Sequence, residues 1–228
     1  MGAANRRLLE AHELGGTVMA YATHIAAALS GTTMRQLSYW RTKTGSGPLL
    51  LPELSSDSRT LYSFRDVVAL RTVAYLREEV SLQRIRKAVV TLRDLGNREH
   101  LAQYTLVAAD GSIVLVSQSE AIDLVKQPGQ QVMAEMSEVL APFVNASGVE
   151  VPDLFQPREQ VSVDQDVLAG YPVIAGTRIP FDLVAGLVSD GVPPAEVADY
   201  YAGVSEAAAE QAADYASYVE SLRSTDAA

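Results

Sequence analysis

The polar side chains best suited to chemistry lie in one run, TMRQLSYWRTK, which covers residues 33–43. The run brings together hydroxyl, amide and cationic groups at Thr33, Arg35, Gln36, Tyr39, Arg41 and Lys43. A guanidinium group matches two phosphate oxygens, a tyrosine hydroxyl donates to one, and a glutamine amide can pair with a base edge. Arg59 and Tyr62 form a second such pair downstream. Groups of these types can contact a nucleic-acid backbone and its bases.

Residues for catalysis or metal binding are scarce in this chain. It has no cysteine, which excludes disulfides and thiolate metal sites. Its three histidines, His12, His24 and His100, are scattered, and none lies in the sequence context of a nucleophilic triad. We therefore expect a protein that is not an enzyme and that holds no metal or cofactor.

Charge is distributed unevenly along the 228 residues, whose formal net charge is −10. Residues 1–100 carry 14 Lys and Arg against 9 Asp and Glu, whereas residues 101–228 carry 4 against 19. A nucleic-acid-binding domain fused to an acidic remainder produces this pattern, because phosphate contacts need positive charge only locally. Two differently charged, solvated domains would produce it as well.

Short helices around a tight turn are expected to position the polar run. Apolar residues at spacings of three and four predict a helix over residues 17–29, and Gly31 suits its stop. A second short helix is expected over residues 34–45, and such a pair is the skeleton of a helix-turn-helix. The further expected elements are a hairpin-like wing over residues 45–63, a helix opened by a capping box of Ser63 and Asp66, and a helix from Ser81 to Gly96.

Residues 17–95 resemble the amino-terminal winged helix-turn-helix of MerR-type regulators. The matching residues are Ile25, Ala26, Gly31, Thr33, Met34, Arg35, Leu37, Tyr39 and Trp40, and the match continues through residues 61–89. The resemblance implies that the second helix enters the DNA major groove by its amino-terminal end, while the wing reaches the adjacent backbone. The family pattern has arginine where this chain has Thr60, two residues before Tyr62, and where it has Ser38, before Tyr39. No long dimerising helix and no cysteine-containing effector site follow, which disfavours a metal- or redox-sensing activator.

Residues 100–158 follow a different pattern. Alternation around Asp110-Gly111 predicts a β-hairpin. Residues 131–143 suit a helix that ends at Pro142, and the proline-containing stretch after it suits a linker or an edge strand. Both an added dimerisation sheet and an independent small domain fit this region.

A third unit begins at Val161, with strands first and helices afterwards. Helices are predicted over residues 181–189, 194–200 and 205–222. The stretch YPVIAGTRIP before them contains Gly176, which supplies the permissive backbone of a turn, and Pro180, which fixes the entry to a helix. No acid, base or nucleophile lies near Arg178 in sequence, so we interpret the stretch as a tight turn whose arginine can contact a partner protein.

The third unit resembles a family labelled as a domain of unknown function, and many members of that family are proposed Vap-type antitoxins encoded beside a toxin with a PIN-type ribonuclease domain. The matching residues are Asp164, Gly170, Pro172, Val173, Ile174, Gly176, Thr177, Arg178, Ile179, Gly191, Glu196 and Val197. A MerR-like head joined to this unit resembles one subgroup of those antitoxins. The candidates for contact with a partner protein are Arg178, Arg223, Tyr215 and Tyr218.

Together these patterns predict a mainly α protein with small β elements (α+β). We expect a DNA-binding domain at residues 1–99, a β-hairpin and linker region at 100–158, and a helical antitoxin-family domain at 159–228. The amino-terminal apolar segment is too short and interrupted to span a bilayer, which favours a cytoplasmic protein. The leading hypothesis is a homodimeric antitoxin that binds a ribonuclease toxin and represses its own operon through operator DNA. The alternative is a stand-alone regulator that senses a small ligand.

Overall fold

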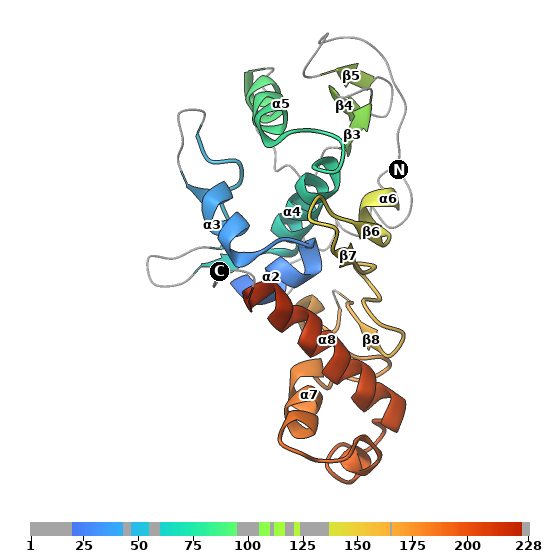
Figure 1. Cartoon of the computed structure of the whole chain (residues 1–228). Coiled ribbons are helices and arrows are strands. Elements are labelled where there is room, and N and C mark those ends of the chain that lie inside the picture. The colour runs from blue at the N-terminus through green and yellow to red at the C-terminus, as the bar shows by residue number, and fades with distance from the viewer. Residues whose placement is uncertain are drawn as a thin grey trace.

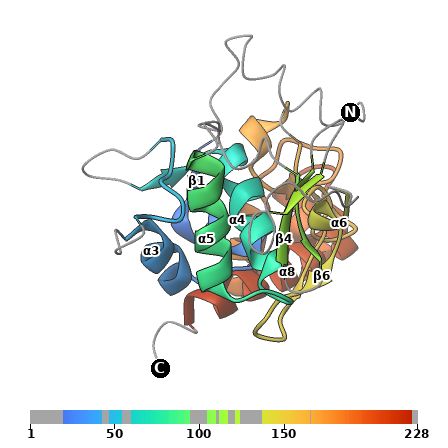
Figure 2. The same ribbon diagram turned by 90° about the horizontal axis from the view of Figure 1, so that it is seen from above.

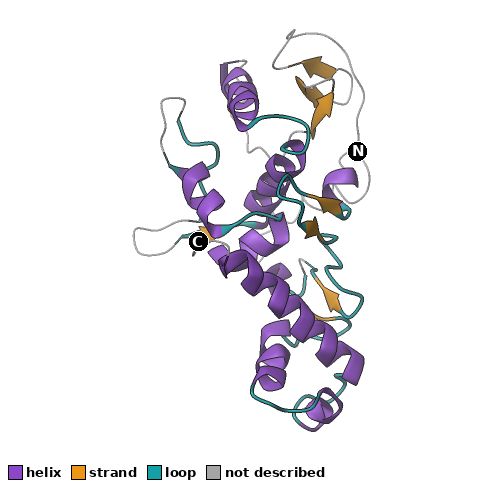
Figure 3. Ribbon diagram, viewed as in Figure 1, coloured by secondary structure: helices purple, strands orange, loops and turns teal. Residues whose placement is uncertain are grey.

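A computed structural model describes residues 20–42, 47–54, 60–94, 105–109, 112–116, 121–123, 137–164 and 166–224 of the chain. Helices make up most of the described residues, and the strands are short antiparallel pairs and one three-stranded sheet (Figure 3). The predicted α+β class is therefore confirmed. Among these residues, no helix is both long and apolar enough to cross a membrane.

The amino-terminal head contains a helix-turn-helix. Its elements are β1 (Tyr21–Ala22), α2 (Thr23–Ser30), α3 (Met34–Arg41), β2 (Leu61–Tyr62), α4 (Phe64–Leu76) and α5 (Leu82–Asp94). Gly31 ends α2 with a left-handed φ of 69°, a conformation that glycine adopts without steric cost. The predicted capping box of Ser63 and Asp66 opens α4, as expected.

Two features of the head differ from the sequence-based expectation. The first helix begins at Thr23 and not at residue 17, because Tyr21–Ala22 form a strand that pairs with β2, with Tyr21 opposite Tyr62. We expected β2 to pair with another strand of the wing. Among the described residues it pairs with β1, which precedes α2. The incoming residue Leu49 instead donates its N–H to the Trp40 carbonyl at 2.8 Å, which fastens the wing to α3. Helical periodicity cannot reveal a strand pair of two residues.

The middle of the chain contributes two separate small sheets. Its elements are β3 (Thr105–Ala109), β4 (Ser112–Val116), β5 (Ala121–Asp123), α6 (Ser137–Leu140), β6 (Phe143–Val144) and β7 (Glu150–Val151). Ala109 pairs with Ser112, so the expected hairpin around Asp110-Gly111 is confirmed by its flanking strands, while the two turn residues lie outside the described part. The stretch expected to be a linker or edge strand forms the β6–β7 hairpin.

A short sheet and three helical segments build the carboxy-terminal unit. Its elements are β8 (Val161–Ser162), η2 (Leu168–Gly170), β9 (Val173–Ile174), α7 (Phe181–Ser189), η3 (Pro194–Asp199) and α8 (Glu206–Ser224). The helix predicted over residues 181–189 has these bounds in the structure, and the segment at 194 is a 3₁₀ helix. Figure 1 shows α8 running from the far end of this unit to α2.

The head and the carboxy-terminal unit share one hydrophobic core. The Tyr218 hydroxyl of α8 donates to the Ala28 carbonyl of α2 at 3.1 Å, and the Tyr21 hydroxyl donates to the Gly170 carbonyl at 3.0 Å. The carboxy-terminal unit therefore packs against the head, with α8 lying beside α2 (Figures 1 and 2). Whether the three predicted segments are separate folding domains stays a prediction.

Arg71 of α4 ties the middle of the chain to the head. Its side chain is completely buried and donates to the carbonyls of Leu29, Val139, Leu140, Ala141 and Pro152, at 2.5 to 3.3 Å. One turn later, the Tyr75 hydroxyl donates to Glu138 at 2.9 Å. A buried cation needs such a complete set of acceptors, because losing water is costly for a charged group. The two side chains fix α6 and β6 beside α4.

Candidate nucleic-acid interface

The amino-terminal end of α3 is built by two residues that the sequence suggested for DNA contact. The Thr33 hydroxyl accepts the Gln36 N–H at 3.1 Å, and the Thr33 N–H donates to Oε1 of Gln36 at 2.8 Å. This capping box engages the glutamine oxygen and leaves both N–H groups of the Gln36 amide for a base edge. Both residues thus hold the end of the helix in place, a role that the sequence analysis did not predict.

One face of α3 is open to solvent and the other lies in the core. Arg35, Ser38 and Tyr39 are exposed, whereas Leu37 and Trp40 are 1% and 3% exposed. Residues three and four apart share a helix face, so Arg35 and Tyr39 lie on the same side. An exposed arginine in the first turn of a helix and an exposed tyrosine one turn later suit the phosphates of a duplex.

Two contacts from other elements reach the side chains of α3. Nη1 of Arg41 donates to the hydroxyl of Thr60, which precedes β2. The guanidinium carbon of Arg86, on α5, lies 5.1 Å from the ring centroid of Tyr39. Thr60 stands where the resemblance led us to expect an arginine, and the structure brings the guanidinium of Arg41 to that position from the recognition helix. Neither contact was anticipated from the sequence.

The remaining residues proposed for DNA contact are placed differently. Tyr62 is 1% exposed and lies in the core opposite Tyr21, and burial is the main cause that raises the pKa of its hydroxyl. In this arrangement its side chain is not on a surface that DNA can touch, because a pleated strand turns alternate side chains inward. Lys43 and Arg59 lie outside the described residues.

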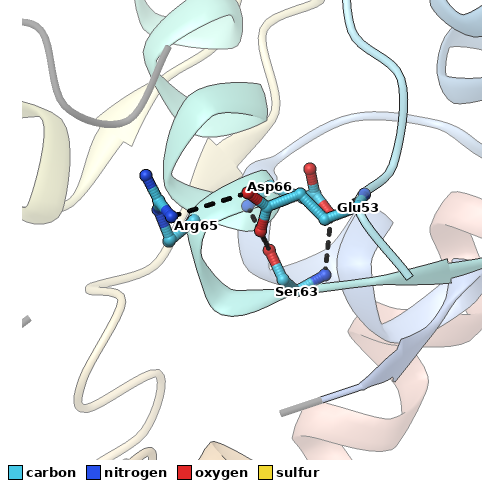
Figure 4. Close-up of polar contacts among 4 residues, drawn as sticks. All are labelled: Glu53, Ser63, Arg65 and Asp66. Atoms are coloured by element: carbon cyan, nitrogen blue, oxygen red, sulfur yellow. Dashed lines mark hydrogen bonds and ion pairs between the residues drawn. The ribbon is translucent and has the colours of Figure 1, made fainter. Parts of the chain in front are cut away.

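A polar cluster anchors the exit of the wing to the start of α4 (Figure 4). The buried Asp66 carboxylate accepts the N–H groups of Ser63 and Glu53 at 2.7 and 3.0 Å. The Ser63 hydroxyl donates to Glu53 at 2.7 Å, and Arg65 lies 3.6 Å from the same carboxylate. Sequence reasoning found the Ser63–Asp66 box but missed Glu53, which lies ten residues earlier and has no fixed spacing to it.

The four residues suggested for partner contact divide into two outward and two inward side chains. Arg178 is exposed on a rigid turn, in which Thr177 Oγ1 donates to the Ile174 carbonyl at 2.8 Å. Arg223 is exposed and lies 2.9 Å from Glu220.

Tyr215 and Tyr218 lie between the carboxy-terminal unit and the head. Tyr215 is completely buried and packs edge-to-face on Phe181 with ring centroids 4.8 Å apart, while Tyr218 bonds to α2. Their side chains hold the chain's own core together and do not form an exposed docking surface in this arrangement. A tyrosine stripe on a helix looks the same in sequence whether it meets another protein or the same chain.

Acidic side chains dominate the exposed surface of the carboxy-terminal unit. The exposed acids of α7, η3, α8 and the loops beside them are Asp182, Asp190, Glu196, Asp199, Glu206, Glu210, Asp214 and Glu220. Tyr200 projects among them and is 61% exposed. In the described residues these acids form no group of three or more placed to hold a metal ion. Their charge makes this unit unsuited to phosphates and suited to a basic protein surface.

Comparison with known families matches both ends of the chain. Residues 21–90 match the MerR HTH family of regulatory proteins, and residues 161–216 match a family described as a protein of unknown function, DUF433. The chain carries a MerR-type helix-turn-helix domain and a DUF433 domain. The candidate interface on α3 lies in the MerR-type domain, and the acidic surface lies in and just beyond the DUF433 domain.

The similar proteins include HTH-type transcriptional regulators of Mycobacterium tuberculosis (Rv1830) and Mycobacterium bovis (Mb1861). Each is 37% identical over 129 residues, which cover 52% of this chain and 56% of the relative. The chain thus spans about half the length of the curated relatives that it matches. A crystal structure of Rv2018 from Mycobacterium tuberculosis aligns with 87% of this chain and 98% of its own, at 18% identity and a TM-score of 0.47.

Proposed function

We propose that this chain is a transcriptional regulator that binds operator DNA through its MerR-type domain. The observation that carries the proposal is the outward face of α3, where Arg35 is exposed in the first turn after a capped amino terminus and Tyr39 is exposed one turn later. Basic charge concentrated in the first 100 residues supports it, because phosphates attract local positive charge. The names of the similar mycobacterial regulators support the same function.

The DUF433 domain supplies the finer part of the proposal. We infer that the chain is an antitoxin, that its acidic carboxy-terminal unit binds a PIN-type ribonuclease toxin, and that a homodimer represses its own operon. A ribonuclease must attract RNA phosphates, so an acidic surface is electrostatically complementary to it. Arg178 is held outward by its turn and suits the acidic metal site of such a toxin.

A stand-alone regulator that senses a small ligand is the second candidate. The naming of the relatives as transcriptional regulators favours it, since their names mention no toxin. The two candidates share DNA binding and differ in the partner of the carboxy-terminal unit.

DNA binding is tested by a gel-shift titration of the full chain with a duplex from the gene's own upstream region. Arg35→Ala should weaken binding by about 5- to 100-fold and lower the slope of log affinity against log salt by about 1, the loss of one phosphate or base contact. Arg178→Ala removes the same charge from the other end of the molecule and should leave affinity and slope unchanged. Equal affinities of wild type and Arg35→Ala would show that α3 is not the DNA-reading element.

The antitoxin role is tested by co-expression with the protein encoded beside this gene. Rescue of growth should accompany a complex that co-purifies, and Arg178→Ala should weaken that complex. Rescue without any stable complex would contradict direct neutralisation. If the neighbouring gene encodes no nuclease, and thermal shift with metabolites stabilises the chain, the small-ligand regulator replaces the antitoxin.

A further inference from the structure

The recognition helix α3 is held on its polar side by two arginine contacts that come from different parts of the head. Arg41, in the last turn of α3, donates to Thr60 at the exit of the wing. Arg86, on α5, places its guanidinium over the ring of Tyr39. Each contact joins one residue of α3 that is suited to a phosphate to one residue of another element.

Thr60 restricts a side chain that would otherwise be mobile. An arginine has several rotatable bonds and loses much rotamer freedom when it grips an anion. The Thr60 hydroxyl accepts one N–H of Arg41, and a guanidinium has five in a planar fork. The remaining N–H groups of the fork are then fixed in direction before DNA arrives, and the cost of ordering the side chain on binding falls.

Arg86 acts on Tyr39 in a comparable way. Arg86 is only 9% exposed, whereas Tyr39 is 51% exposed, so a buried guanidinium group supports a ring that faces solvent. The stacked cation holds the plane of the ring, and an arginine over an aromatic face is a favourable electrostatic pair. The Tyr39 hydroxyl is thereby held at the surface of α3, on the same side as Arg35.

We propose that Thr60 and Arg86 are positioning residues for DNA binding: Thr60 aims the guanidinium of Arg41, and Arg86 holds the ring of Tyr39, at phosphates beside the recognition helix. The proposal rests on DNA binding by the MerR-type domain. It makes α5 and the wing exit functional parts of the interface, although the groups that touch DNA belong to α3. The resemblance led us to expect an arginine at position 60, where this chain has threonine. The proposal explains how a guanidinium group is still present at that point, because Arg41 supplies it.

Thr60 is tested with two variants in the full chain. Thr60→Val removes the hydroxyl and keeps the shape of the side chain, and Thr60→Ser keeps the hydroxyl and removes the methyl group. By fluorescence anisotropy with a labelled duplex of the upstream region, Thr60→Val should weaken binding about 3- to 10-fold, the effect of one hydrogen bond to a charged group, while Thr60→Ser binds like wild type. In an Arg41→Ala background, Thr60→Val should cause no further loss, because the hydroxyl acts only through that arginine.

The Arg86 contact is tested from both sides. Arg86→Gln should weaken binding about 3- to 10-fold, the effect of an aromatic–cation pair, and should do nothing further in a Tyr39→Leu background. Tyr39→Leu leaves the buried arginine in place, so it keeps the test valid if Arg86→Gln disturbs folding. Thermal unfolding followed by circular dichroism shows which variants retain the wild-type midpoint.

The outcomes separate this proposal from the proposed function. If wild type binds duplex DNA and Arg35→Ala weakens it, but Thr60→Val and Thr60→Ser bind alike, the positioning role of Thr60 is overturned and DNA binding stands. Losses that add fully in the Arg41→Ala and Tyr39→Leu backgrounds would equally overturn it. A wild-type chain that binds neither its upstream duplex nor unrelated DNA at low salt would overturn both.

Discussion

Arg71 is the side chain whose removal should damage the fold most. Four of its N–H groups donate to five main-chain carbonyls of α2, α6 and the segments after them, with three of the carbonyls sharing the two N–H groups of Nη2. At about 1.5 kcal/mol for each charged N–H group, these bonds contribute about 6 kcal/mol. Burial opposes them, because it lowers the Arg71 pKa to about 10, which corresponds to about 3 kcal/mol against the charged form. We therefore expect Arg71→Met to lower the free energy of unfolding by about 3 kcal/mol.

Urea unfolding of the full chain measures this change. Arg71→Lys should lose about half as much, because an ammonium group has three donors and no planar fork with which to reach five carbonyls. Arg77→Met, at the carboxy-terminal end of the same helix, is a matched control and should change stability by no more than about 0.5 kcal/mol.

Amide hydrogen exchange locates the loss. In Arg71→Met, residues 137–154 should exchange faster, since the bonds from Val139 to Pro152 hold this segment to α4, while α7 and α8 stay protected. A variant as stable as wild type, with unchanged protection of this segment, would refute the argument that the buried cation fixes the middle of the chain.

Two further predictions concern the seams between the parts of the chain. Gly31→Ala should cost at least about 2 kcal/mol in urea unfolding, because left-handed backbone disfavours other residues and its Cβ would lie 2.2 Å from Cγ2 of Val151. Adding Val151→Ala should restore part of the lost free energy of unfolding, because it removes the atom that the new Cβ would touch. If the free-energy changes of the two substitutions were fully additive, the close contact would be contradicted. Burial, aided by Arg223, lowers the pKa of His24, although nearby carboxylates oppose it. The folded protein then binds this proton less readily than the unfolded chain, so stability is complete above about pH 7 and falls as the pH drops through about 6.5. His24→Gln should flatten that part of a plot of Tm against pH, and an unchanged slope would refute the contribution of His24.

Much of the fold could be predicted because it depends on local signals. Gly31 as a helix stop, the Ser63–Asp66 box and the turn at Asp110-Gly111 each act within a few residues, so their spacing is visible in sequence. The candidate interface on α3 was predicted from the residues that resemble the MerR-type helix-turn-helix. The start of α2 was missed because strand β1 exists only through its pairing with β2, some forty residues away.

The sequence by itself determined most of the local elements, the basic and acidic halves, and the polar and charged groups that α3 carries. Only the tertiary structure decided which of those groups face solvent. Tyr62 and Tyr215 are buried, Arg41 meets Thr60, Arg86 meets Tyr39, and Arg71 serves carbonyls up to 81 residues away. The physical reason is that a side chain's type and period fix what it can bind, whereas its partner depends on which distant segment packs against it. No spacing rule encodes that choice, because it results from burying one core that the head and the carboxy-terminal unit share.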